Sequence, residues 1–279
     1  MFNRVKRSFL RRATNLINKI KTNESDDIYF LKNQKLVNIG AGNFSHPKWI
    51  NLEYSTEWYD KLPGNFISYN LTSKEKWPLE NNSVDAYYCS HVIEHILKED
   101  VERMVVNAFK SLKKGGVLRI TCPDASIVYD ACKNKDYSYF ADQITFYSLK
   151  ENYKHQYKNS LLNAEIEDLL VDVIATSRCN LRLNSVDPID TLIVKEKLES
   201  KSKKEFLDWL TDKLLFDPKR AGEHITWWDY DKLKAVCKDA GFVDIKKSAY
   251  LQSSIGSMRI PNLFDARHPH KSFYIECTK

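Results

Sequence analysis

The sequence predicts an α/β fold in which a mostly parallel sheet is covered by helices on both faces. Short apolar runs typical of buried strands recur at residues 36–39, 49–52, 66–70, 84–90 and 117–122. Helical or turn-like segments separate these runs, and the longest, 92–112, carries apolar residues at three- and four-residue spacing. Strands that alternate with helices form parallel sheets, whose ligands bind at the carboxyl ends of the strands.

The stretch from Leu36 to Glu53 contains the first two strands and the clearest candidate for a binding site. Its first strand ends at Gly40, Ala41 and Gly42, where the glycines would let backbone N–H groups approach a ligand. Its second strand ends at Glu53, whose carboxylate can accept hydrogen bonds from two neighbouring ribose hydroxyls. The pattern indicates a nucleoside-binding turn, but a strand that ends in GxG is also common as plain turn chemistry.

Residues 1–22 hold the whole excess of positive charge. They contain seven Lys and Arg and no acid, a charge of +7 against a total of +6, which leaves −1 for the remaining chain. Their apolar residues recur at helical spacing, so we expect a basic amphipathic helix, followed by a polar linker up to residue 34. Such a helix could lie on an anionic membrane surface, or dock on its own domain or on a second copy in a homodimer. Nucleic acid is a weaker candidate, because no aromatic-interleaved basic patch follows.

Length and composition indicate one or two domains and argue against a disulfide-bonded secreted protein and a membrane-spanning protein. The 279 residues suffice for one large α/β domain with an insert or for two small domains. The six cysteines form no CxxC pair and follow no secretory segment, which predicts reduced thiols in a cytoplasmic protein, with any inner-membrane contact made by residues 1–22. No apolar stretch approaches the roughly 18 residues that a membrane-spanning helix requires.

Four stretches together resemble the class I S-adenosylmethionine-dependent methyltransferases: VNIGAG, INLE, WPLENNSVDAYYCSHVIEHI and LKKGGVLRITCPD. The segments HITWWDYDKLKAVCKDAGF and RHPHKSFYIE are similar to a bacterial branch associated with polysaccharide biosynthesis. The resemblance implies a Rossmann-like, seven-stranded sheet whose last strand is antiparallel, with the last two strands at 243–251 and 272–277. It also implies a methyltransferase domain at 35–132 and 221–279, with 133–220 as a mainly helical insert over the acceptor site.

The same resemblance makes S-adenosyl-L-methionine the expected cofactor. The methionine part would face Gly40, Ala41 and Gly42, the ribose Glu53, the adenine Asn70 and Leu71, and the reactive methyl Ser90 and His91. The chain departs from the family at two places. Asn70 stands where Asp is usual, and its side-chain carbonyl could still accept from the adenine amine. Only residues 43–48 separate the glycine turn from the next strand, too few for a crossover helix.

Three other functions are compatible with parts of the sequence. A NAD-dependent oxidoreductase would need GxGxxG at the start of a full helix and an acid about 20 residues on, whereas here Ser45 replaces the third glycine and Glu53 comes early. A methyltransferase for RNA would use the basic residues 1–22 to bind its substrate, and another small molecule could also be the acceptor. A non-catalytic subunit would bind the cofactor without transferring its methyl group.

His91, Glu94 and His95 form an HxxEH pattern, which in inverted zinc proteases places two imidazoles on one face of a helix. Here the pattern follows a strand of a predicted nucleotide-binding sheet, and no third ligand lies at a telling spacing. We therefore expect no metal site. Instead we expect Glu94 and His95 at the start of the following helix, where the helix dipole favours a carboxylate.

Methyl transfer to a hydroxyl requires a base that removes the proton, and three residues are candidates. His224 lies just before the aromatic segment 227–230, His91 lies on the expected cofactor floor, and Asp124 follows the strand at 117–122. Each has a structural alternative. His224 could simply bond a loop, His91 could only line the floor, and Asp124 could be a helix N-cap.

The insert is the expected wall of the acceptor site. Its aromatic residues are numerous enough to stack on a sugar ring or base, and core packing explains them at least as well: Tyr137, Tyr139, Phe140, Phe146, Tyr147, Tyr153 and Tyr157. Tyr147 and Trp227 are the expected substrate contacts, and Arg267 and His268 could bind an anionic group such as a phosphate. The sequence thus predicts O-methylation of a carbohydrate or of a phosphate-bearing glycan precursor.

Overall fold

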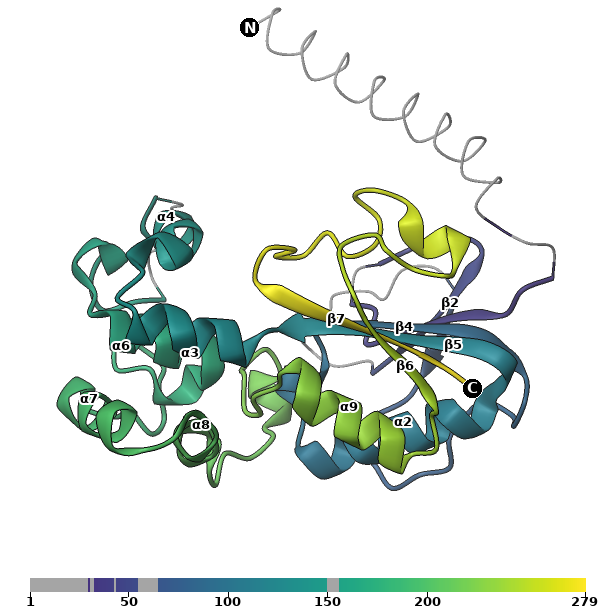
Figure 1. Cartoon of the computed structure of the whole chain (residues 1–279), viewed down its shortest axis with the longest axis horizontal. Helices are drawn as coiled ribbons and strands as arrows, with labels where there is room; N and C mark the ends of the chain where they lie inside the picture. Colours follow the sequence, from purple (N-terminus) through teal and green to yellow (C-terminus); the bar gives the residue numbers. More distant parts are fainter. Residues whose placement is uncertain (1–29, 31–32, 43, 55–64, 150–155) are drawn as a thin grey trace, which may run out of the picture.

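The computed structural model describes residues 30, 33–42, 44–54, 65–149 and 156–279 (Figure 1). The predicted basic helix at 1–22, most of the linker that follows it and Tyr153 lie outside the described residues. In the part of the chain that is described, no helix is both long enough and apolar enough to span a bilayer.

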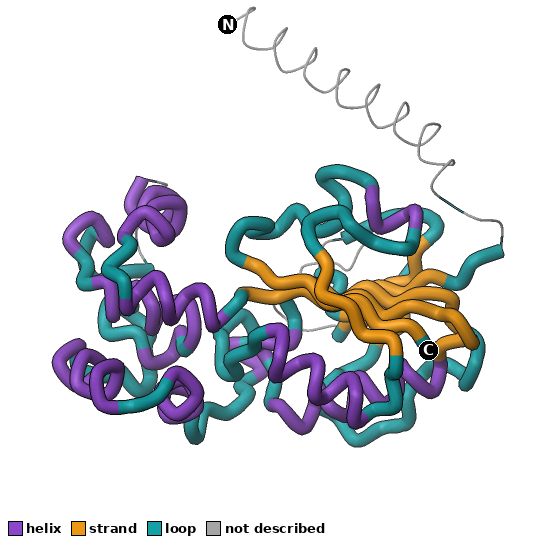
Figure 2. Tube along the Cα trace, viewed as in Figure 1, coloured by secondary structure: helices purple, strands orange, loops and turns teal. Residues whose placement is uncertain are grey.

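Seven strands form one sheet in the order β3-β2-β1-β4-β5-β7-β6, drawn in orange in Figure 2. They are β1 (Leu36–Ile39), β2 (Trp49–Glu53), β3 (Phe66–Ser68), β4 (Val84–Ser90), β5 (Leu112–Pro123), β6 (Asp244–Ser248) and β7 (Ser272–Thr278). Strands β1 to β5 are parallel, and β7 runs antiparallel to both β5 and β6. The predicted fold class is confirmed, including its antiparallel last strand.

The α-helices fall into two groups (Figure 1). Two of them, α2 (Lys98–Ser111) and α9 (Tyr230–Asp239), pack beside each other under the sheet. The others lie beyond the carboxyl end of β5: α3 (Ala125–Lys133), α4 (Ala141–Leu149), α6 (Ile166–Ile174), α7 (Thr191–Ser200) and α8 (Lys203–Thr211). Short 3₁₀ helices include η2 (Ile93–His95) and η7 (Gly256–Arg259). The second group builds an apolar core of its own, which is closed by Ile225 and Trp227 as the chain returns to the sheet.

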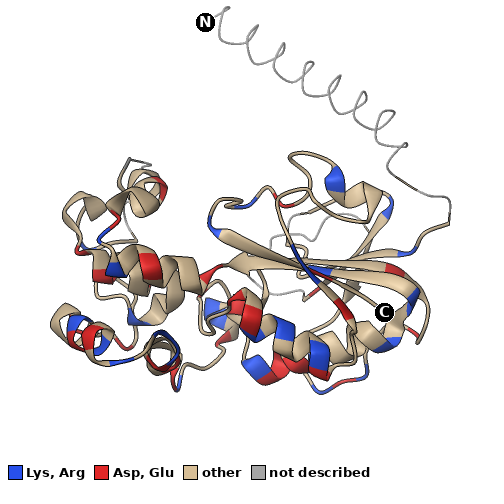
Figure 3. Cartoon of the chain, in the orientation of Figure 1, with Lys and Arg blue, Asp and Glu red and all other residues tan. Residues whose placement is uncertain are grey.

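The two faces of the sheet are covered differently. Tyr87 and Cys89 of β4 belong to the core between the sheet and helices α2 and α9. Ala86 and Tyr88 point to the other face, toward Phe264 and the segment that contains η7. This alternation follows from the two-residue period of a strand. The outer sides of α2 and α9 carry charges of both signs, as Figure 3 shows, because only one stripe of each helix is buried.

The connection from β1 to β2 contains no helix in its described residues. The Gly40 N–H donates to the Leu52 carbonyl at 2.8 Å, and the Phe44 N–H donates to the Ala41 carbonyl at 2.9 Å. The expectation that residues 43–48 are too few for a crossover helix is confirmed. As a result, the glycine turn lies directly against the end of β2, where Glu53 is located.

Candidate functional site

The glycine turn and Glu53 form a bonded unit at the carboxyl edge of the sheet. Gly40 and Gly42 have φ of +63° and +52°, a region that glycine adopts without strain. The Gly42 N–H donates to Glu53 Oε2 at 2.7 Å, and the Tyr54 N–H donates to Glu53 Oε1 at 2.7 Å. Burial raises the pKa of Glu53, and these two hydrogen bonds oppose the rise. Each carboxylate oxygen retains a lone pair that a ribose hydroxyl could use.

Gly40 is also required by protein packing. A Cβ at this position would lie 2.3 Å from Cγ2 of Val92, far inside van der Waals contact. The space left by the missing side chain is therefore filled by Val92 rather than left open to a ligand. This contact places the glycine turn directly beside the segment that begins at His91.

Asn70 and Leu71 lie just after β3, and the side-chain carbonyl of Asn70 and the backbone carbonyl of Leu71 already accept hydrogen bonds within the protein. The Asn70 side-chain carbonyl accepts from both the N–H and the hydroxyl of Thr72, at 2.9 and 2.8 Å. Both of its lone pairs are occupied, so the expected bond to an adenine amine would have to displace one of them, while the amide NH₂ can still donate. The Leu71 carbonyl accepts from Arg103 at 3.1 Å, and the Leu71 side chain packs on the core of the sheet.

His91 follows β4 in a left-handed conformation, with φ of +54°. Its Nε2 lies 3.1 Å from the Arg267 carbonyl and 3.1 Å from the Ser272 hydroxyl, and its Nδ1 lies 3.2 Å from Glu94 Oε1. Both ring nitrogens therefore have neighbours within the protein. The half-buried Ser90 precedes it, at the end of β4 as expected.

Glu94 lies in η2, and α2 begins only at Lys98, so the expectation that Glu94 and His95 open the following helix is wrong. The Glu94 side chain is buried, and neither carboxylate oxygen has a hydrogen-bond partner among the described residues. Burial would raise the pKa of Glu94, but the imidazoles of His95, His91 and His224 outweigh it and lower the pKa to about 2.

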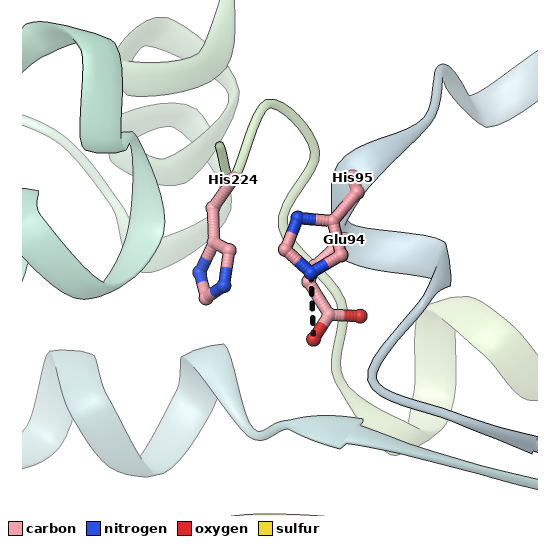
Figure 4. A group of neighbouring side chains, drawn as sticks. All are labelled: Glu94, His95 and His224. Carbon is pink, nitrogen blue, oxygen red and sulfur yellow. Dashed lines mark ion pairs between the residues drawn. The ribbon is translucent and has the colours of Figure 1, made fainter. Parts of the chain in front are cut away.

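The segment that returns from the helical group brings His224 to the same place. The N–H groups of Ile225 and Thr226 donate to the Glu94 backbone carbonyl at 2.9 and 3.2 Å. His224 consequently faces His95, with ring centroids 4.8 Å apart, and the Glu94 carboxylate lies beside both rings (Figure 4). One nitrogen of His95 and one of His224, together with a Glu94 oxygen, lie within 4.8 Å of one another.

The outer nitrogens of the two rings are held by backbone carbonyls. Nδ1 of His95 lies 3.0 Å from the Glu223 carbonyl, and Nδ1 of His224 is bonded to the Val173 carbonyl. Because a carbonyl only accepts, both Nδ1 atoms carry protons in the neutral rings and both Nε2 atoms present lone pairs. Burial lowers the pKa of His224 to about 4, so this ring is neutral near pH 7.

A small, partly open cavity lies beside this cluster. Its walls include Glu94 and His224 and, from the returning segment, Trp227 and Trp228. The expected substrate contact Trp227 thus lies beside His224, with its indole N–H bonded to Asp208 at 2.9 Å.

The other expected residues divide between structural roles and the outer surface. Asp124 caps α3, since its carboxylate accepts from the Ser126 N–H at 3.0 Å, which confirms the N-cap alternative. The Tyr147 ring packs at a tilt against that of Tyr157 within the helical group, with ring centroids 5.0 Å apart, and Tyr147 does not line the cavity.

Core packing is confirmed for two of the insert aromatics, Phe140 and Tyr157, which are buried in the second core. Arg267 and His268 are exposed, and the His268 ring lies 6.0 Å from that of His91. All six cysteines are buried and unpaired.

Comparison with known proteins gives one family match. Residues 48–120 match a family model described as a methyltransferase domain. A solved S-adenosylmethionine-dependent methyltransferase from Mesorhizobium loti is 12% identical to the chain, with a TM-score of 0.39, over 92% of this chain and 96% of its own. A second, from Archaeoglobus fulgidus, is 12% identical, with a TM-score of 0.41, over 94% of this chain and 93% of its own. A possible histamine N-methyltransferase from Thermotoga maritima is 12% identical, with a TM-score of 0.38, over 91% of this chain and 86% of its own. These structures are too distant to support an argument about activity. No curated protein matches the chain.

The family match and the observed topology agree. The matched residues run from just before β2 into β5, and the seven-stranded sheet with an antiparallel β7 is what the resemblance to class I methyltransferases implied. The left-handed glycine turn and the carboxylate of Glu53 suit a nucleoside cofactor at the carboxyl edge of this sheet. Residues 48–120 therefore match a methyltransferase domain, in a sheet with the topology that the resemblance to class I enzymes implied, and S-adenosyl-L-methionine is the methyl donor that this match indicates.

Proposed function

We propose that the chain methylates a hydroxyl oxygen of a carbohydrate or of a phosphate-bearing glycan precursor. The class of acceptor is supported by the resemblance of the segments at 224–242 and 267–276 to a branch associated with polysaccharide biosynthesis. A hydroxyl, unlike an amine, must lose its proton as it is methylated, and the cluster at the cavity offers groups that can assist.

The observation that carries the proposal is the contact of His224 Nδ1 with the Val173 carbonyl, which leaves the lone pair of the neutral ring on Nε2, at the cavity wall. The Val173 carbonyl fixes this tautomer, and burial keeps the ring neutral near pH 7. We assign His224 to the acceptor hydroxyl, either as direct proton acceptor or through an ion that it holds. His91 has neighbours at both ring nitrogens, and Asp124 caps a helix, which leaves both less suited to the role.

The cofactor would be held by Gly40, Ala41 and Gly42 with Glu53, and by Asn70, Leu71, Ser90 and His91 beyond them. When bound, it supplies an electrophilic methyl group on a sulfonium. The residues of this chain then position the acceptor, exclude water through Trp227 and Trp228, and receive the hydroxyl proton. The exposed Arg267 and His268 lie on the His91 side of the site, where they could bind a phosphate of the acceptor.

The test is an assay of methyl transfer to a panel of nucleotide sugars and phosphate-bearing glycan precursors, read as the mass gain of one methyl group. In His224→Asn the amide can still donate to the Val173 carbonyl, but the Nε2 lone pair is gone. We expect kcat to fall at least about a hundredfold with unchanged binding of S-adenosylhomocysteine. Glu102→Gln, on the exposed side of α2, is the control. Full activity in His224→Asn, or transfer to RNA and to no glycan, would reject the proposal.

A further inference from the structure

We propose that Glu94, His95 and His224 bind one divalent transition-metal ion, through a carboxylate oxygen and the two Nε2 atoms. The ion would lie between η2 and the segment that returns from the helical group, at the wall of the cavity (Figure 4).

The Glu94 carboxylate is buried and has no hydrogen-bond partner among the residues that the structure describes. Its side chain is 4% exposed, and both oxygens are buried without a hydrogen-bond partner in the part of the chain that is described. A buried carboxylate without hydrogen bonds is costly unless a positive charge compensates it. The groups that face it are imidazoles: Nδ1 of His91 at 3.2 Å and Nε2 of His95 at 3.8 Å.

The imidazole rings of His95 and His224 are oriented as in metal-binding histidines. Histidines that bind metals usually donate their other N–H to a carbonyl or carboxylate, which fixes the tautomer and aims the lone pair. His95 and His224 both show this arrangement, toward the carbonyls of Glu223 and Val173. Two rings from distant parts of the sequence thus aim lone pairs toward the same carboxylate.

The three candidate atoms are close enough to share one ion after rotation of their side chains. They lie within 4.8 Å of one another, whereas ligands at about 2.1 Å from an ion in tetrahedral geometry are about 3.4 Å apart. The longest separation therefore has to shorten by up to about 1.4 Å when the ion binds. His91 Nδ1, 3.2 Å from Glu94 Oε1, borders the same space and could orient Glu94 or serve as a fourth ligand.

The ligand set also selects the ion. Two imidazoles and one carboxylate favour Zn²⁺, Fe²⁺ or Mn²⁺ over Mg²⁺ and Ca²⁺, which prefer oxygen ligands throughout. Three protein ligands leave positions open, as in catalytic metal sites. One consequence rests on the proposed function: an acceptor hydroxyl that binds an open position would lose its proton more readily.

Metal binding can be measured without acceptor or cofactor, so it can fail independently of the proposed function. The full chain, free of any affinity tag, is stripped with EDTA, dialysed against Zn²⁺ or Mn²⁺ and analysed for metal content. We expect about one ion per chain, and a melting temperature that rises with added ion. Mg²⁺ at the same concentration should produce neither effect.

Matched variants locate the site. Glu94→Gln and His224→Asn should each lose most of the bound metal while keeping the circular dichroism of the unsubstituted chain. Glu167→Gln replaces another buried glutamate, and His270→Asn an exposed histidine, and both should keep the ion. Absence of binding to the folded chain, or equal metal content in Glu94→Gln and His224→Asn, would overturn the proposal. In that case a proton on the imidazoles alone compensates Glu94.

Discussion

Two buried carboxylates in this molecule have opposite surroundings. Asp265, which is 1% exposed, accepts from the Arg119 guanidinium at 2.6 and 3.2 Å, from the Tyr88 hydroxyl at 3.2 Å and from the Leu251 N–H at 2.9 Å. Glu94, which is 3% exposed, has no hydrogen-bond partner for either oxygen among the described residues, and its Oε1 lies 3.2 Å from Nδ1 of His91 and 3.8 Å from Nε2 of His95.

The difference separates a structural charge from a functional one. Arg119 also donates to the Ala249 carbonyl at 2.8 Å, so the ion pair with Asp265 ties the segment after β6 to the middle of β5. Both oxygens of Asp265 and all three side-chain nitrogens of Arg119 have partners among the described residues. Glu94 lies at the wall of a cavity, where an added cation would compensate its charge. Buried charge alone therefore does not indicate a site, whereas buried charge without hydrogen bonds does.

The largest expected effect is on the paired carboxylate. Arg119→Met leaves Asp265 buried without its partner, and breaking such a pair costs about 3–5 kcal/mol in the free energy of unfolding. Urea denaturation followed by circular dichroism measures it. Lys98→Met, which removes an exposed pair with Glu102, should cost less than about 0.5 kcal/mol. A loss below about 1 kcal/mol for Arg119→Met would remove the contrast between the two regions.

A smaller effect is expected at the unpaired carboxylate. In buffer with EDTA, Glu94→Gln removes a buried charge that makes no hydrogen bonds but whose pKa the neighbouring imidazoles lower, so we expect the free energy of unfolding to fall by about 1–2 kcal/mol, less than for Arg119→Met. The same denaturation experiment tests this. A loss comparable to that of Arg119→Met would show that Glu94 stabilises the fold through its imidazole neighbours, and the two carboxylates would then be alike.

Glu53 lies between these extremes, with one backbone hydrogen bond on each oxygen. If it also accepts the ribose hydroxyls, Glu53→Gln should weaken S-adenosylhomocysteine binding about tenfold, measured by calorimetric titration. Glu102→Gln should bind normally. Unchanged affinity in Glu53→Gln would assign the carboxylate to the turn alone.

The pH dependence of that affinity gives a finer test. Burial raises the pKa of Glu53 above 4.5, so on acidification it takes up its proton earlier than an exposed glutamate does. The protonated form loses acceptor capacity, and affinity should fall as pH drops through the raised pKa. Stability has the opposite sign: the folded state holds the proton more tightly, so the contribution of Glu53 is fully present below 4.5 and is lost as pH rises through the raised pKa. Both slopes should be absent in Glu53→Gln.

The sheet could be predicted because its signals are local. The apolar run at 84–90 coincides with β4, and the stop at Gly40 marks the end of β1. β5 begins at Leu112, five residues before its apolar run at 117–122. Leu112 pairs with Val84 and Val117 pairs with Ala86, and residues 113–116, which carry no strand pattern, form the irregularity between these two pairs. Pairing across a sheet is not visible in a local pattern.

Only the part of the site formed by residues close in sequence could be predicted. Gly42 and Glu53 were found together because one short connection brings them into contact. The cluster was missed because His224 reaches Glu94 through backbone hydrogen bonds from Ile225 and Thr226, which no spacing in the sequence reveals. Arg119 and Asp265 were missed for the same reason.

The measurement that tests the central contrast most directly is anomalous X-ray diffraction from crystals of the full chain grown with Zn²⁺, recorded on both sides of the zinc absorption edge. The structure predicts one strong peak among Glu94 Oε1, His95 Nε2 and His224 Nε2, and none beside Asp265. Crystals with well-ordered Glu94, His95 and His224 side chains but no peak between them would contradict the account.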